Sequence, residues 1–197
     1  MAEIKKTIDM VMERAARMAA ASTAEIDNEE QLKAGMRLAA EYLNQPSTDL
    51  AETLAAQPPA NQRDLRRGMV QTLLRNVVLP RDTGLKERSS LALKGVLDLL
   101  QESGGAAVTT VCAELQQILE QYNQHKEQAT KQLEDAILNQ LEQQYAARGG
   151  RPGKLSPNMH PKYHDELARM LGDINGQYNQ AMDQRKETIS RQMADFS

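Results

Sequence analysis

His160 and His164 are the residues whose types and spacing come nearest to a metal site. They lie four residues apart at the start of the last predicted helix, next to Asp165 and Glu166, and imidazole and carboxylate groups are zinc ligands. A zinc site needs a third ligand, and the remaining histidine, His125, is expected about 36 Å away along a helix axis. We therefore interpret His160 as a helix cap and the two acids as partners of the helix dipole. No bound metal and no cofactor are expected.

Nucleophiles are present, but none has a partner in sequence that would activate it. Cys112 lies in an apolar stripe and cannot form an internal disulfide, because it is the single cysteine, so it is interpreted as a small buried side chain. Ser89, Ser90, Thr109 and Thr110 lack a histidine nearby in sequence. The paired carboxylates resemble ordinary solvated helix faces. The sequence therefore predicts a protein that is not an enzyme.

A basic segment rich in glycine and proline covers residues 148–154. Its cations are Arg148, Arg151 and Lys154. Glycines with basic residues also form phosphate-binding loops, but Lys154 is followed by leucine rather than serine or threonine, and no strand is predicted before the segment. A P-loop is therefore excluded. Two interpretations stay open: a solvated turn, or a contact point for phosphate, nucleic acid or an acidic protein.

A second basic feature is an arginine stripe. Arg63, Arg66 and Arg67 are spaced to share one helix face, and Arg75 follows two turns later. Such stripes contact DNA and RNA backbones in many proteins. The pI is about 5.7 and no aromatic residue that could stack on a base lies near the stripe in sequence. A protein contact is therefore favoured, and a nucleic-acid-binding module that uses the stripe and the basic segment is the alternative.

The charges of the chain are segregated along it. Residues 61–94 contain eight Lys or Arg against three Asp or Glu, whereas residues 95–147 contain two against eight. Residues 1–60 are also acidic, with ten acids against six bases. We favour pairing within the molecule as the reason, for example between the arginine stripe and Glu25, Glu29 and Glu30. Contact between subunits or with another partner is the alternative.

Composition and periodicity predict an all-α fold. The chain has 197 residues, 40% of them apolar, with one Phe and no Trp, which is a profile of helix formers. We expect a bundle of about five short helices over residues 1–104, with breaks at Pro46, Pro58 and Pro80. The expected helices cover residues 3–21, about 22–46, 47–57, about 61–80 and about 82–102.

Residues 105–197 are expected to form a long antiparallel, coiled-coil-like helical hairpin. No Pro or Gly occurs from Ala106 to Arg148, and a helix of that length needs a partner along it. The next predicted helix, about 161–195, supplies one, with a Gly- and Pro-rich basic turn near residues 149–160. A copy of the helix in a second chain, through a domain swap, is the alternative.

The apolar stripes of the hairpin suggest a register. Ile137 is predicted opposite Ile174 and Tyr122 opposite Ile189, so that the polar gap at His125 and Lys126 faces Arg185 and Lys186.

No apolar stretch approaches the roughly 20 residues of a membrane span. We therefore expect a cytoplasmic scaffold, adaptor or assembly protein that binds a protein partner or associates with itself, without membrane contact.

Overall fold

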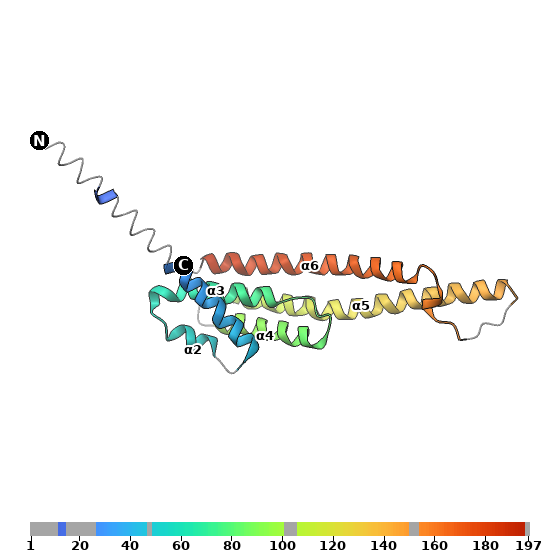
Figure 1. Cartoon of the computed structure of the whole chain (residues 1–197), viewed down its shortest axis with the longest axis horizontal. Helices are drawn as coiled ribbons and strands as arrows, with labels where there is room; N and C mark the ends of the chain where they lie inside the picture. The colour runs from blue at the N-terminus through green and yellow to red at the C-terminus, as the bar shows by residue number, and fades with distance from the viewer. Residues whose placement is uncertain (1–11, 15–26, 47–48, 101–105, 150–153, 196–197) are drawn as a thin grey trace, which may run out of the picture. The chain divides into compact units, whose positions relative to one another are not determined.

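The computed structural model describes residues 12–14, 27–46, 49–100, 106–149 and 154–195. The described residues form helices and connecting segments without strands, so the expected all-α fold is confirmed. The expected helix over residues 3–21 lies almost entirely outside the described residues. A helix covers residues 27–44, and the labelled elements of Figure 1 are α2 (Leu50–Ala55), α3 (Pro59–Asn76), α4 (Thr83–Leu100), α5 (Ala106–Ala147), η2 (Pro157–Met159) and α6 (Tyr163–Asp195).

The chain divides into two compact units. The first contains the residues up to Asn76 together with residues 91–105 and the last residues of the chain, and the second contains residues 77–90 and 106–192. In the first unit, the Asp49 side chain caps α2 by accepting hydrogen bonds from the main-chain N–H groups of Ala51 and Glu52. The core of this unit is aliphatic, and its fully buried side chains include Leu50, Met69, Leu73, Val96 and Leu99.

The helix over 27–44 crosses α3 at very short range in this first unit. A Cβ atom added at Gly35 would overlap the carbonyl oxygen of Leu65, and one added at Gly68 would overlap the carbonyl oxygen of Leu32. Because glycine has no Cβ, the two main chains can touch at this crossing. The contact holds α3 closely against the helix over 27–44.

In the second unit, a buried serine ties the segment after α3 to the start of α4. Ser89 is fully buried, and its hydroxyl donates to the carbonyl oxygen of Val78 at 3.0 Å while it accepts from the Val78 N–H at 3.1 Å. A buried hydroxyl that is engaged with the main chain contributes to folding and is not available as a nucleophile.

Helices α5 and α6 of this unit contact each other in antiparallel directions. The Tyr122 hydroxyl donates to the Asn175 side-chain oxygen at 2.8 Å, and the Tyr122 and Tyr178 rings meet edge to face with centroids 5.5 Å apart. Nearer the other end of α6, the Arg185 guanidinium forms an ion pair with Glu114. Tyr122 therefore lies level with Tyr178.

The register expected from the apolar stripes is wrong. Tyr122 was expected opposite Ile189, so α6 is displaced by about 11 residues, or about 16 Å along the helix axis. A shift of 11 residues is three helical turns, which keeps the apolar stripes facing each other. The expected register would have placed Lys126 against Arg185, two like charges, whereas the observed register gives Arg185 the carboxylate of Glu114.

The connection between α5 and α6 is the second reason for the shift. Residues 154–162, the described part of this connection, lie beside α5 in Figure 1, and η2 contacts that helix. Leu155 of the connection packs on a buried cluster of Ile137, Leu141 and Tyr163. Because these residues run back along α5 before α6 begins, α6 starts level with Ile137 rather than near the end of α5.

Candidate functional site

A row of basic side chains runs along the exposed face of α3. Arg63, Arg67, Gln71 and Arg75 are all exposed and follow one another at four-residue intervals, so they share one side of the helix over about 18 Å. The opposite side of α3 buries Leu65, Met69 and Leu73. We call Arg63, Arg67, Gln71 and Arg75 the basic row.

Arg66 does not belong to this row, although the arginine stripe inferred from sequence included it. Its side chain is half-buried, and its Nε atom is buried without a hydrogen-bond partner. The stripe therefore splits, because Arg66 lies toward the side of α3 that packs inward while Arg63 and Arg67 face solvent. Arg75 continues the exposed face, and its four-residue spacing through Gln71 is the sequence signal that identifies the row.

The arginines of the row make no ion pair within the part of the chain that the structure describes. The pairing expected with Glu29 and Glu30 is not formed. Glu29 instead accepts from Lys33 on its own helix at 2.8 Å, and this hydrogen bond lowers the pKa of the Glu29 carboxyl. Glu25 lies outside the described residues. The charge of the row is thus available to a partner.

The basic segment at the end of α5 is also exposed at its described positions. Arg148 and Lys154 face solvent, and Arg151 lies outside the described residues. Gly149 adopts a φ of 72° and its N–H donates to the Ala146 carbonyl, which ends α5. Tyr145 and Met159, two large apolar side chains close in sequence to these cations, are exposed as well.

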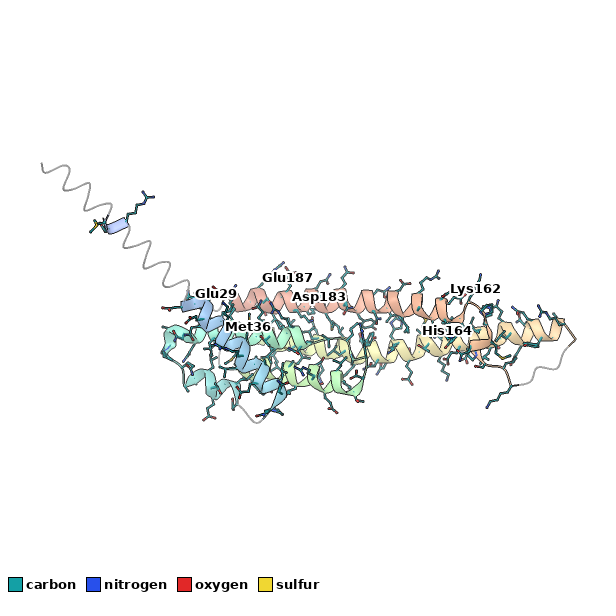
Figure 2. The ribbon with its side chains drawn as sticks, viewed as in Figure 1. Glu29, Met36, Lys162, His164, Asp183 and Glu187 are labelled. Atoms are coloured by element: carbon teal, nitrogen blue, oxygen red, sulfur yellow. The ribbon has the colours of Figure 1, made fainter. Side chains whose placement is uncertain are left out.

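The two histidines are in different environments. His160 is 7% exposed, and its Nδ1 atom accepts from the Lys162 N–H at 3.4 Å. His164 is exposed, with its ring beside that of Tyr163, and Figure 2 shows it with Lys162 at the start of α6. Within the described ranges, no three His, Cys, Asp or Glu side chains are grouped so that they could hold a metal ion.

The pKa values of Cys112 and Tyr163 in the second unit are shifted. Burial raises the pKa of the Cys112 thiol to about 11, so the reactive thiolate is scarce at neutral pH. The Tyr163 hydroxyl donates to Glu134 at 2.9 Å, and this hydrogen bond raises the pKa of Tyr163. Neither group is set up as a nucleophile, since both shifts favour the protonated form.

The described residues thus define an all-α protein whose most distinctive exposed surface is the basic row. None of the helices that the structure describes is long and apolar enough to span a bilayer. The chain belongs to DUF6657, a family of unknown function, and the match covers residues 51–191, which include the basic row. Searches of curated proteins and of solved structures find no match to the chain.

Proposed function

We propose that this protein is a non-catalytic helical adaptor or assembly component, that it acts in the cytoplasm, and that it binds an acidic protein surface through the basic row. The observation that carries the proposal is the row itself: Arg63, Arg67 and Arg75 are exposed and without ion pairs among the described residues, in a chain whose net charge is −3. Desolvated arginine is frequent in protein interfaces because its planar guanidinium pairs with carboxylates through two parallel hydrogen bonds.

Nucleic acid is the competing partner, because arginines along a helix also match phosphates. The basic row offers three cations, and its sequence neighbourhood has no aromatic residue for base stacking. Non-specific DNA binding through so few phosphate contacts is weak at physiological salt. An acidic protein surface fits the row better, since it can add apolar contacts around the charges.

The test compares a row variant with a matched control. The row variant is Arg63→Gln, Arg67→Gln, Arg75→Gln, and the control is Lys94→Gln, Lys162→Gln, Arg169→Gln, which removes the same charge from exposed positions elsewhere. Each tagged chain is expressed in the native host, proteins retained by the wild type are identified by mass spectrometry, and the principal one is purified for titration calorimetry.

We expect the control to bind that partner like the wild type and the row variant to bind about tenfold or more weakly, which is about 1.4 kcal/mol. Equal binding by all three chains would contradict the proposal. The same chains are titrated with a random-sequence duplex at about 150 mM salt. A tenfold loss of duplex affinity confined to the row variant would favour the nucleic-acid function instead.

A further inference from the structure

The outer face of α5 carries a set of acidic side chains whose charge is opposite to that of the basic row. Glu120, Glu127, Asp135 and Glu142 are all exposed and follow one another after seven or eight residues, so they lie on one side of the helix. None of them forms an ion pair in the part of the chain that the structure describes. Lys131 is the cation on this side. We call these four acids the acidic face of α5.

The middle of the acidic face borders an open groove with a volume of about 680 Å³. Three carboxylates, two lysines and two neutral polar side chains of α5 line it, so a cationic side chain that enters it finds carboxylate and amide oxygens as hydrogen-bond acceptors. The residues that line the groove are Asn123, Lys126, Glu127, Thr130, Lys131, Glu134 and Asp135.

We propose that the acidic face of α5 receives the basic row of a second copy of this chain. This inference rests on the proposed function and names the partner surface. The acidic face and the basic row carry matching charges, three net negative charges counting Lys131 against three positive. Their spacing also agrees, because Glu127 and Asp135 are eight residues apart, as Arg67 and Arg75 are.

Equal spacing matters because both surfaces are helical. Eight residues span about 12 Å on either helix, so two guanidinium groups on α3 meet two carboxylates on α5 when the helices lie alongside each other. Each chain carries both surfaces and therefore takes part in two such contacts, one through each surface. Exposed ion pairs are screened by salt, so the association is strongly salt-dependent.

The test is sedimentation equilibrium of the full chain at about 100 µM, in about 20 mM and about 500 mM NaCl. Three variants accompany the wild type. The row reversal is Arg63→Glu, Arg67→Glu, Arg75→Glu, the face reversal is Glu120→Lys, Glu127→Lys, Asp135→Lys, and the control is Lys94→Glu, Lys162→Glu, Arg169→Glu. Circular dichroism verifies folding, and the milder Gln variant of the row replaces its reversal if that reversal unfolds.

We expect the wild type and the control to associate at low salt, with affinity falling at least tenfold at high salt, and each reversal alone to be monomeric. Mixing the two reversals should restore association, because each then supplies the charge that the other lacks. A monomeric wild type at low salt, reversals that associate like the wild type, or a mixture that stays monomeric would each overturn the inference. If the wild type is monomeric but the Gln variant of the basic row still loses binding to a host protein, the self-association is contradicted and the proposed function stands.

Discussion

Gly35 and Gly68 form a reciprocal contact in the first unit, in which each glycine lies against the main chain of the other's helix. Gly35 faces the carbonyl group of Leu65, and Gly68 faces that of Leu32. The contact brings the two main chains together at one point of α3, the helix that also carries the exposed Arg63 and Arg67.

Replacing Gly68 with alanine should therefore destabilise the protein. The added methyl group would overlap the Leu32 carbonyl, which is main chain and cannot move without separating the helices. We expect the free energy of unfolding to fall by about 1 to 3 kcal/mol, despite the better helix propensity of alanine. Urea denaturation measures the change, and an unchanged or higher stability would show that the helices do not cross at this point.

Gly176→Ala should have the opposite effect. Gly176 lies inside α6, is exposed, and has no atom of the described chain within 4 Å of the position a Cβ would take. The substitution should raise the free energy of unfolding by about 0.5 to 1 kcal/mol through helix propensity alone. A loss of stability in the same urea titration would mean that another group packs on this face of α6.

The Cys112 thiol should resist modification in the native protein. It is 2% exposed, and burial raises its pKa to about 11, so at pH 8 about one thiol in a thousand is ionised. A disulfide reagent should react with Cys112 within seconds in denaturant. Under native conditions the reaction should be limited by the rate at which the protein unfolds. The control is Cys112→Ala, Gly176→Cys, whose exposed thiol should react at once. Rapid labelling of native Cys112 would contradict its burial.

Lys186→Met should stabilise the protein at pH 7. The Lys186 side chain is 19% exposed, and burial lowers its pKa although Asp183 acts in the opposite direction. The folded chain therefore loses the Lys186 proton at lower pH than the unfolded chain does. Burial of the charged ammonium group destabilises the fold at neutral pH, and this cost falls as the pH rises through the lowered pKa of Lys186. We expect a gain of about 1 kcal/mol at pH 7 that shrinks in alkaline solution.

The control for this prediction is Arg191→Met. It removes an exposed cation of α6 that forms an ion pair with Glu187. Figure 2 shows Glu187 and Asp183 on this helix. Its effect should stay within about 0.5 kcal/mol at either pH. If Lys186→Met destabilises the chain, or its gain is constant with pH, then the Lys186 ammonium group makes favourable contacts in the folded state.

The helix boundaries were predictable because they depend on local chemistry. Pro46, Pro58 and Pro80 each lie just outside or between the observed helices, and the glycine-free stretch after residue 105 is one helix, α5. Proline removes a hydrogen-bond donor wherever it occurs, so such breaks can be identified without knowledge of tertiary packing.

The helix register was not predictable by the same means. Apolar side chains recur every three or four residues on both α5 and α6, so displacing one helix by three turns leaves apolar positions opposed. The choice depends on groups outside the stripes, namely the ion pair of Glu114 with Arg185 and the packing of Leu155 on Ile137. Neither interaction is visible from the periodicity of one helix.

The candidate site was predictable in part. The exposed positions of Arg63 and Arg67 agree with their shared helix face, but the half-buried Arg66 does not. Arg66 is next to Arg67 in sequence, about 100° away around the helix, so which of the two is exposed depends on the tertiary packing around α3. That packing involves contacts between helices, such as the one at Gly35 and Gly68, which the sequence of α3 alone does not show.

The pairing of α5 with α6 determines which side of α5 is exposed, and a disulfide test addresses the pairing and its register directly. In a Cys112→Ala background, one variant carries Leu133→Cys and Leu167→Cys, two positions that pack on the same buried cluster. A second carries Ile137→Cys and Ile174→Cys, which the observed register separates by about 16 Å along the axis. Both are oxidised at low concentration and run on a non-reducing gel.

The measurement is the fraction of chain crosslinked within one molecule. We expect the pair at Leu133 and Leu167 to close nearly completely into a faster-migrating monomer, because facing core positions of paired helices approach the separation a disulfide requires. The pair at Ile137 and Ile174 should stay reduced. Efficient closure of Ile137 with Ile174, or closure of either pair only between chains, would contradict the register of α5 and α6 within one chain.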